Sequence, residues 1–350
     1  MIIQSIILKK FRSYSDARFD FAAGVNVIAG ANGIGKTNLL EAVYLSMRGT
    51  SFRVPDKELP MYGSSWFRLD AVFDEQRRTI RYQSDKAPAK QISINDGANK
   101  RFMRPMSLPV VLFEPDMLRV LSGSPARRRR LLDEFITQWY DDGATVLRRY
   151  ERVLLQRNNI LRDAYMLSHA QLEDRLFAWD VSFAELADHV ERYRRQTVAT
   201  INQSLTDTYG KIAKKPHLAE LQYSGMEQED KQAVLKSLHY HRRADIARGH
   251  TTIGPHRSDF AVFLNGKSSD ITASRGEQRS LVLAMKHIEA DELERMHGTS
   301  PILLFDDVMS ELDSDRQRAL IKGIGMSQTI ITTTAADSWR ADEAHILTLR

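Results

Sequence analysis

The sequence contains no cysteine among its 350 residues. This absence excludes disulfide bonds, thiol catalysis, cysteine-ligated zinc and iron–sulfur clusters, and it fits a reducing compartment. Long apolar runs are absent too, since none approaches the ~20 residues that span a membrane. The N-terminus does not predict a secretory signal, because its apolar residues precede Lys9 and Lys10 instead of following them. We therefore expect a cytoplasmic protein with no membrane partner.

An excess of one charge is also absent. Lysine and arginine total 50, whereas aspartate and glutamate total 45, which leaves a net charge of +5. This small excess permits a nucleic-acid partner without requiring one. Hydrophobic residues make up 42% of the chain and charged residues 27%, which excludes overall disorder. The length is typical of about two domains.

Hydrophobic patterns predict an α/β core that is interrupted by a mostly helical insertion. Short β-branched runs predict strands at both ends of the chain, and the segment 38–47 has apolar residues at helical spacing. Residues 206–229 predict irregular structure or a strand. The other predicted helices are 131–139, 144–161, 175–205, 230–247, 278–296 and 314–321. The predicted organisation is 1–125 for the first part of the core, 126–250 for a helical lobe and 251–350 for the rest of the core.

A phosphate-binding loop is predicted between a strand and a helix near the N-terminus. The segment GANGIGKT fits the pattern G-x-x-x-x-G-K-[ST], and glycines let backbone N–H groups approach phosphate oxygens. We expect Lys36 to reach the β- and γ-phosphates of ATP and Thr37 to hold Mg²⁺. The residues expected around the nucleotide are Gly30, Ala31, Asn32, Gly33, Ile34, Gly35, Lys36, Thr37 and Asn38.

A second candidate element is the apolar strand 302–305, which runs into Asp306 and Asp307. Two adjacent acids at the end of a buried strand need a cation or hydrogen-bond donors to balance them. We expect Asp306 to bind or orient Mg²⁺, and Asp307 to orient or deprotonate the attacking water. Together with Lys36, these two acids are the candidate catalytic residues.

Four arginines lie in the first turn of the helix predicted after Ser124 and Pro125. The positive end of a helix disfavours cations, so these arginines need an anionic partner, either acids within the fold or the phosphates of DNA or a nucleotide. The candidate DNA-binding residues are therefore Arg127, Arg128, Arg129 and Arg130. Further arginines, at positions 148, 149, 152, 157 and 162, predict a basic helix that faces solvent.

Two further candidate segments lie in the last third of the chain, one before a predicted helix and one before a predicted strand. Ser274 and Gly276 stand at the start of a predicted helix, where they offer a hydroxyl and N–H groups to an anion, although a helix cap explains Ser274 equally well. His256 lies in the segment GPHR before a predicted strand. A lone histidine without a metal-ligand spacing favours a structural role.

The order of these motifs resembles the bacterial RecF family over nearly the whole chain. The segments that carry the resemblance are LKKFRSY, GANGIGKTN, SPARRRRLLDEF, YERVLLQRNNIL, GPHRSDF, SRGEQRS and ILLFDDVMSELD. The resemblance implies an ABC-type P-loop ATPase core, a mixed sheet with helices, that is related to SMC proteins. It also implies a mostly helical second lobe without a long coiled coil.

The resemblance further implies an ATP-dependent DNA-binding protein of recombinational repair, replication restart and the SOS response. ATP and Mg²⁺ would be its cofactors. Its partners would be DNA, as duplex or at single-strand/duplex junctions and gaps, and a recombination-mediator protein. Binding of ATP would drive homodimerisation that clamps DNA, and weak DNA-linked hydrolysis to ADP and phosphate would release it.

Several residues take a family role by position. The segment 274–278 stands for the signature motif, in which Ser274, Gly276 and Gln278 would meet the nucleotide of a second copy, and 310–313 stands for the D-loop. Thr332 or Thr333 stands at the switch position. Arg12 and Arg53 are similar to the SMC-type arginines near the nucleotide.

The chain departs from the family pattern of ABC ATPases in two places. Asp307 stands where many of these ATPases have glutamate, which predicts slow turnover, and the segment 113–116 lacks the glutamine of a Q-loop. Two alternative functions are the ATPase subunit of a membrane transporter and a P-loop kinase of small molecules. The strand-rich start, the GPHR segment and the large helical insertion argue against the transporter. The kinase predicts an acceptor pocket and activity without dimerisation, and the sequence shows no such pocket.

Overall fold

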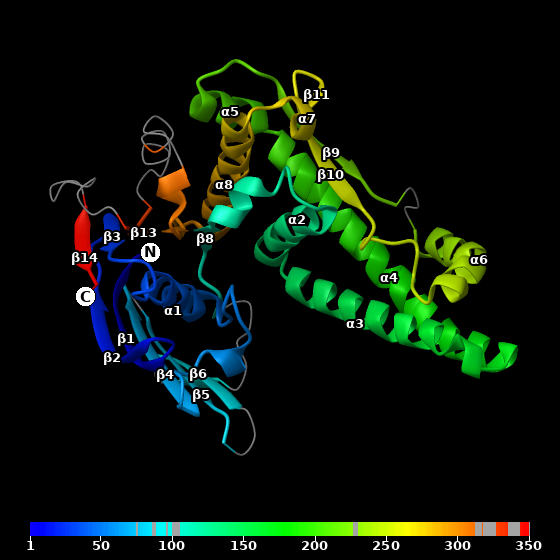
Figure 1. Ribbon diagram of the computed structural model, residues 1–350, viewed down its shortest axis with the longest axis horizontal. Helices are drawn as coiled ribbons and strands as arrows, with labels where there is room; N and C mark the ends of the chain where they lie inside the picture. Colours follow the sequence, from blue (N-terminus) through cyan, green and yellow to red (C-terminus); the bar gives the residue numbers. More distant parts are fainter. Residues whose placement is uncertain are drawn as a thin grey trace. The chain divides into compact units, whose positions relative to one another are not determined.

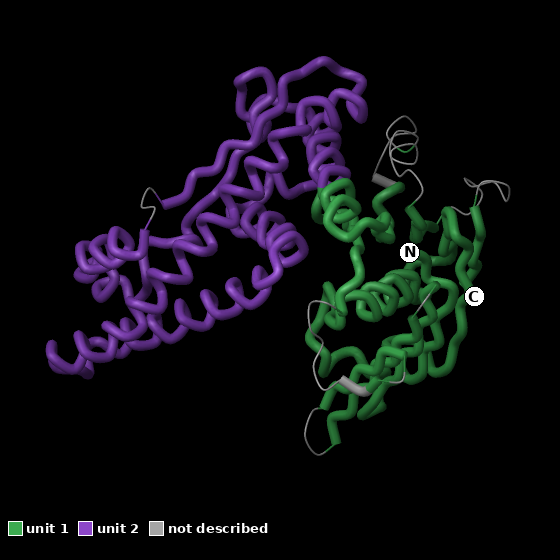
Figure 2. The backbone as a smooth tube through the Cα atoms, turned by 180° about the vertical axis from the view of Figure 1, so that it is seen from behind, with its two compact units in different colours: residues 1–117, 289–350 green, residues 118–288 purple. Residues whose placement is uncertain are grey.

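A computed structural model describes residues 1–74, 76–85, 89–95, 97–99, 106–226, 230–311, 317, 327–334 and 344–349. The chain forms two compact units, one of residues 1–117 and 289–350 and the other of residues 118–288 (Figure 2). Both ends of the chain thus build the first unit. The second unit continues past residue 250, where we expected the helical lobe to end, because strand 259–264 pairs with strand 219–224 of the insertion.

The first unit holds an antiparallel sheet of six strands in the order β2-β1-β4-β5-β6-β7 (Figure 1). Its strands alternate buried and exposed residues, as in β4 and β5, so that one face packs on a core. The bounds are β1 (Ile3–Phe11), β2 (Tyr14–Asp20), β4 (Trp66–Phe73), β5 (Arg77–Gln83), β6 (Ala89–Ile94) and β7 (Gly97–Asn99).

A second sheet in this unit contains five parallel strands in the order β14-β3-β13-β12-β8. Its three inner strands are buried along almost their whole length, which is typical of strands covered on both faces. The bounds are β3 (Val25–Ala29), β8 (Val110–Phe113), β12 (Ile302–Phe305), β13 (Thr329–Thr333) and β14 (His345–Thr348). Because the strands are parallel, the segments that follow β3, β12 and β13 meet at one edge of the sheet.

Helix α1 (Lys36–Arg48) contacts both sheets. Its apolar residues Leu39, Leu40 and Val43 belong to one buried cluster that also includes residues of β1, β4, β12 and β13. The helix ends at Gly49, whose φ of 70° places it in the left-handed region that favours glycine. The core of the unit therefore holds the helix that begins at the predicted phosphate loop.

The second unit is mostly helical and also contains a three-stranded antiparallel sheet in the order β11-β10-β9 (Figure 1). Residues 206–229, for which we expected irregular structure or a strand, include helix α5 and strand β9. The bounds are α2 (Pro125–Trp139), α3 (Gly143–Arg162), α4 (His169–Asn202), α5 (Leu205–Ala213), β9 (Ala219–Ser224), α6 (Lys231–Arg248), β10 (Asp259–Leu264), β11 (Lys267–Ser268), α7 (Ser269–Thr272) and α8 (Arg275–His297), which crosses from this unit into the first.

Side chains close the outer edge of β9. The amide of Asn202 donates to the carbonyl of Leu221 at 2.8 Å and accepts its N–H at 2.8 Å. The hydroxyl of Thr206 pairs with the carbonyl and N–H of Ala219 in the same way, at 3.0 and 3.1 Å. This part of the edge is therefore blocked against pairing with another strand.

Parts of two predicted features lie outside the described residues. The predicted helix 314–321 falls there except for Gln317, and the predicted D-loop falls there from Leu312 onward. Strand β14 lies close to the C-terminus and was not predicted, because its four residues lack a clear alternation. Among the described residues, no helix is long and apolar enough to cross a membrane.

Candidate nucleotide-binding site

The predicted phosphate loop connects β3 to α1 and contains two glycines in the left-handed region. The φ angles of Gly33 and Gly35 are 79° and 116°. A Cβ atom on Gly35 would also lie 2.8 Å from Oγ of Ser13. Position 35 therefore requires glycine for its backbone angle and for the close approach of the β1–β2 turn.

Lys36 lies across this loop. Its Nζ donates to the carbonyl oxygens of Gly30 at 2.8 Å and Ala31 at 3.0 Å, and the residue is 7% exposed. The residue before α1 is Gly35, which has no side chain with which to cap the helix. The ammonium group and the first N–H groups of the helix thus gather at one place, which is an arrangement that binds phosphate.

Thr37 and Asp306 are brought together from positions 269 residues apart in the sequence. The Thr37 hydroxyl donates to Oδ1 of Asp306 at 2.7 Å, and the Thr332 hydroxyl lies 3.0 Å from the same oxygen. These side chains come from α1, the end of β12 and β13. A hydroxyl and a carboxylate beside a phosphate loop are oxygen donors of the kind that Mg²⁺ prefers, so the residues fit this ion.

Asp307 has a backbone φ of 52°, in the left-handed region that residues other than glycine seldom adopt. Its N–H donates to the hydroxyl of Thr332 at 2.8 Å. Thr332 is fully buried and therefore fixes the turn that carries both acids. Thr332, one of the two threonines predicted for the switch position, thus contacts the side chain of Asp306 and the backbone N–H of Asp307.

The two predicted arginines lie in the same unit as the phosphate loop. Arg53 is exposed, and its Nη1 lies 3.5 Å from Oδ1 of Asn38 in the first turn of α1. Arg12 donates to the carboxylate of Glu41 at 2.9 Å and to the carbonyl of Glu58 at 3.1 Å. Arg53 therefore touches the predicted nucleotide-binding segment, whereas the Arg12 side chain is held beside it by one carboxylate and one carbonyl.

Sequence reasoning missed two neighbours of the loop. The hydroxyl of Tyr14 donates to the carbonyl of Gly35 at 3.1 Å, and burial raises the pKa of this tyrosine to about 12. The amide of Asn38 donates to Oγ of Ser13 at 3.0 Å. Ser13 and Tyr14 both belong to the LKKFRSY segment. The resemblance of this segment to the family could have identified them as candidate site residues.

Comparisons with known proteins show the family of the chain. A family model described as "AAA domain" matches residues 5–234. The "DNA replication and repair protein RecF" of Desulfitobacterium hafniense DCB-2 is 33% identical over 97% of this chain and 94% of its own length. The protein of the same description from Heliobacterium modesticaldum is 37% identical over 95% of this chain and 92% of its own length. The chain belongs to the RecF family.

A solved RecF structure has the same fold. The structure described as "recombination mediator protein RecF-ATP in RecFOR pathway" matches with a TM-score of 0.84 at 27% identity, over 97% of this chain and 93% of that chain. The predicted family and the predicted ABC-type α/β fold are therefore confirmed.

The residues predicted for the signature motif lie at the start of α8 in the second unit. Ser274 and Glu277 cap the helix reciprocally: Oγ of Ser274 accepts the N–H of Glu277, and Oε2 of Glu277 accepts the N–H of Ser274 at 2.9 Å. The hydrogen bond from Lys215, followed by those from Ser274, lowers the pKa of Glu277 to about 2. Gln278 is buried and donates to the carbonyl of Ser269 at 2.8 Å, so its side chain points into the fold.

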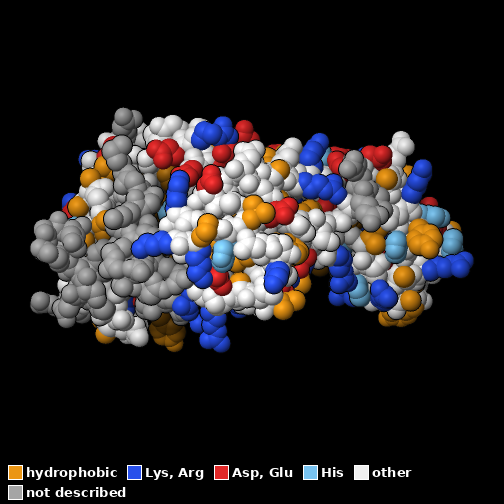
Figure 3. All heavy atoms as spheres, turned by 90° about the horizontal axis from the view of Figure 1, so that it is seen from above, with side chains coloured by type: hydrophobic (Ala, Val, Ile, Leu, Met, Phe, Trp, Pro, Cys, Tyr) orange, Lys and Arg blue, Asp and Glu red, His pale blue; other side chains and the backbone are white. Residues whose placement is uncertain are grey.

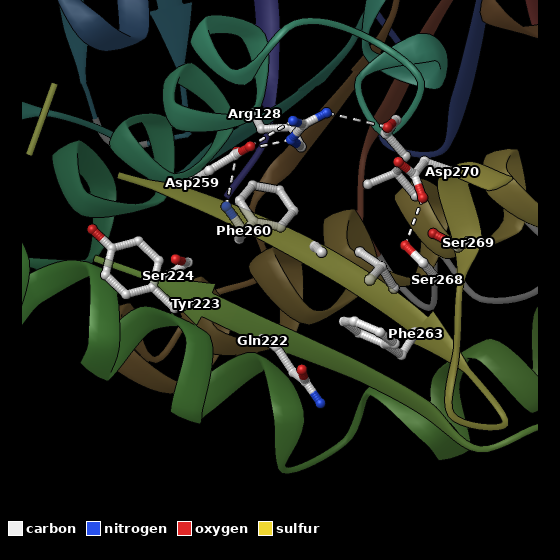
Figure 4. Close-up of a pocket in the computed structure, with 13 residues that line it drawn as sticks. Arg128, Gln222, Tyr223, Ser224, Asp259, Phe260, Phe263, Ser268, Ser269 and Asp270 are labelled. Carbon is white, nitrogen blue, oxygen red and sulfur yellow. Dashed lines mark hydrogen bonds and ion pairs between the residues drawn. The ribbon is translucent and has the colours of Figure 1, made fainter. Parts of the chain in front are cut away.

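The four arginines of the run differ in exposure. Arg128 makes two hydrogen bonds to the carboxylate of Asp259, at 2.8 and 2.5 Å, and Arg129 donates to the carbonyl of Ser258 at 3.0 Å. Figure 4 shows Arg128 turned toward Asp259 at one end of a cavity of about 480 Å³. Arg127 and Arg130 are exposed.

The prediction that the arginines of this basic helix face solvent is wrong for Arg157, which is fully buried. Its Nε donates to Asp180 at 2.7 Å, and its Nη1 donates to Asp245 and to Oγ1 of Thr251, each at 2.8 Å. We predicted an exposed Arg157 because its acidic partners, Asp180 and Asp245, lie on other helices and far away in the sequence. The RNN part of the RecF motif thus joins α3 to α4, α6 and the segment before GPHR.

His256 is tied into the same unit by hydrogen bonds and has no metal partner among the described residues. Its Nδ1 lies 2.8 Å from the hydroxyl of Tyr150, and its Nε2 lies 3.0 Å from the carbonyl of Thr251. The carbonyl only accepts, so Nε2 carries the proton and Nδ1 accepts from the tyrosine. Burial lowers the pKa of His256 to about 4, which agrees with this neutral form and with a structural role.

Proposed function

We propose that this chain is an ATP-dependent DNA-binding protein that acts in recombinational repair, replication restart and the SOS response in the cytoplasm. The observation that carries the proposal is the meeting of Lys36, Thr37 and Asp306 at one edge of the parallel sheet. The names of its relatives support the rest, since they describe DNA replication and repair proteins and a RecF structure with ATP.

ATP would lie on the loop 30–38, with its phosphates at the N–H groups that begin α1. Lys36 holds two carbonyl oxygens in this structure, and it would exchange them for the β- and γ-phosphates. Thr37 and Asp306 are the residues that would hold Mg²⁺. The ion would supply charge neutralisation to the phosphate oxygens.

Hydrolysis to ADP and phosphate would depend on Asp307, held by Thr332. The shorter side chain of aspartate reaches less far than the glutamate of many ABC ATPases, so we expect weak turnover. The bond from the Asp307 N–H to Thr332 fixes the backbone from which the carboxylate extends. Thr332 would therefore position the candidate base without touching water itself.

A second copy of the chain would complete the site. Each copy has one phosphate loop and one signature-like helix start, and a two-fold pair would bring these together at two identical sites. Ser274 and Gly276 of one copy would then contact the γ-phosphate held by the other. ATP would thereby contribute contacts to the dimer, and hydrolysis would remove them.

DNA would be bound through its phosphates by exposed cations of the closed dimer. Lysine and arginine side chains occur in several small groups on the face in Figure 3, with acidic side chains between them. Arg127 and Arg130 are exposed candidates, whereas Arg128 and Arg129 are engaged within the fold. Phosphate contacts position a protein on DNA without reading its bases, so we expect recognition of gaps and junctions rather than of sequence. A recombination-mediator protein is the expected protein partner.

Sedimentation tests the proposal and separates it from its alternatives. We expect a monomer without ATP, a dimer with ATP and Mg²⁺, and a larger complex when gapped DNA is added. A protein that hydrolyses ATP as a monomer and ignores DNA would instead indicate a small-molecule kinase. Copurification with a membrane protein would indicate a transporter subunit. Either result would overturn the proposal.

Replacing Ser274 by aspartate tests the composite site. Aspartate is a good helix cap, but it loses the bond that the Ser274 hydroxyl donates to Glu277, and it places a second carboxylate beside that acid, where a phosphate would also bind. Circular dichroism of the variant must therefore first show wild-type helix content. We expect ATP-dependent dimerisation to be lost while ATP binding to a single copy is kept. The matched control is Ser168→Asp, since Ser168 caps α4 in a box with Gln171. Equal dimerisation by both variants would refute the composite site.

A further inference from the structure

The two arginine-bearing segments beside the phosphate loop are tied to one buried carboxylate. Glu41 lies in the second turn of α1 and is fully buried. Its Oε2 accepts from Nε of Arg12 at 2.9 Å, and its Oε1 accepts from the hydroxyl of Ser51 at 2.5 Å. Both neighbours donate to it, so a carboxylate, which only accepts, satisfies them together.

Ser51 links the carboxylate of Glu41 to the backbone of Arg53. The serine proton is directed to Glu41, so the lone pairs of the hydroxyl face the following residues. They accept the N–H of Arg53 at 2.9 Å and the N–H of Val54 at 3.2 Å. Glu41 therefore fixes the turn from which the Arg53 side chain reaches the start of α1.

Arg12 is fixed directly. Its φ of 51° places it in the left-handed region, and its N–H donates to the carbonyl of Leu59 at 2.9 Å. Its Nη1 donates to the carbonyl of Glu58 at 3.1 Å, while Nε is held by Glu41. The Arg12 side chain is 19% exposed, so the guanidinium is oriented by these bonds but is not sealed in the core.

We propose that Glu41 is a positioning residue of the nucleotide site, which orients Arg12 directly and Arg53 through Ser51 toward the phosphates of ATP. This inference rests on the proposed function, because it requires that both arginines contact a bound nucleotide. Glu41 itself does not touch the nucleotide. Its effect is to remove, before binding, the conformational freedom that the arginines would otherwise lose on binding.

Glutamine cannot replace this carboxylate. The amide of a Glu41→Gln variant has one oxygen, and Arg12, which only donates, takes it. The amide NH₂ then faces the hydroxyl of Ser51, whose oxygen already accepts two N–H groups. The bond between position 41 and Ser51 is lost, and the turn that carries Arg53 is released.

The experiment compares ATP affinity and amide hydrogen exchange in the wild type and two variants. In Glu41→Gln, we expect faster exchange of the Arg53 and Val54 amides and ATP affinity that is lower by about tenfold, the order expected for one charged hydrogen bond. The matched control is Glu58→Gln, which alters an exposed side chain of the adjacent segment and should change neither quantity. Faster exchange with unchanged ATP affinity would overturn the inference alone. A wild-type protein without ATP affinity would overturn the proposed function.

Ser51→Ala provides a second route if Glu41→Gln does not fold. This variant keeps Glu41 paired with Arg12, so no buried charge is left alone. We expect weaker ATP binding, and we expect no additional loss when Ser51→Ala is introduced into an Arg53→Ala background. Losses that add in full would show that Ser51 does not act through Arg53, and they would overturn the inference.

Discussion

Replacing Arg157 by methionine tests whether the buried ion network holds the helical unit together. Arg157 is fully buried and donates to Asp180, Asp245 and Thr251 at distances between 2.7 and 2.8 Å. The variant leaves two buried carboxylates without this cation. Breaking a buried ion pair from one side costs ~3–5 kcal/mol of the free energy of unfolding.

Other donors place the expected cost near the lower end of this range. Arg242 still donates to Asp180 at 2.7 Å, and Thr252 still donates its N–H and hydroxyl to Asp245 at 2.9 and 2.6 Å. We therefore expect Arg157→Met to lower the free energy of unfolding of this unit by about 3 kcal/mol. Adding Asp245→Asn should restore part of the loss, because it removes one of the uncompensated charges.

Equilibrium urea unfolding followed by circular dichroism measures this effect, since the helical unit dominates the helix signal. The matched control is Arg152→Met, the same change at an exposed position of α3, with an expected effect within ~0.5 kcal/mol. A value for Arg157→Met that equals the control would refute the structural role of the network. An equal loss in single and double variants would show that the buried charge of Asp245 is not its cause.

Three further predictions concern the acids, the histidine and the arginine run. Thr332→Val removes both the acceptor of the Asp307 N–H and the hydroxyl beside Asp306, so ATP turnover should fall by about tenfold, and unchanged turnover would contradict the role of Thr332 in fixing the two acids. The lowered pKa of His256 means that the unfolded chain takes up a proton first as the pH falls, so up to ~3 kcal/mol of stability should be lost between about pH 6.5 and pH 4. Urea unfolding across this range should show a weaker pH dependence for His256→Gln, and parallel curves would contradict the assignment. Arg130→Ala should reduce the slope of log affinity for DNA against log salt concentration by about 0.9, without loss of stability. Arg128→Ala should instead lower stability, because Arg128 is bonded to Asp259. Unchanged DNA binding by Arg130→Ala would remove Arg130 from the interface.

Local motifs predicted much of the first unit. The phosphate loop consists of consecutive residues, and its glycines, lysine and threonine act through the backbone that they themselves form, so their spacing predicts their geometry. The buried strand 302–305 and its two acids were visible for the same reason. The interruption of the core by a helical insertion was also predicted, because strand and helix differ in hydrophobic period.

Contacts between distant segments were invisible in the sequence. Glu41 looks like any acid on a helix, and Arg157 looks like one more exposed arginine of a basic helix. Their partners lie on other elements, and only the folded chain shows that both side chains are buried and charged. Thr332 likewise gains its contacts with the acids only through the pairing of β12 with β13.

The sequence by itself therefore predicted the candidate phosphate loop and the family of the chain, because short-range backbone geometry depends on consecutive residues. The tertiary structure decided which charges are buried, which arginines of the run remain exposed and which hydroxyls fix the acids. The reason is that burial and hydrogen bonding depend on what packs against a side chain, and in this fold the neighbours that matter are separated by tens to hundreds of residues.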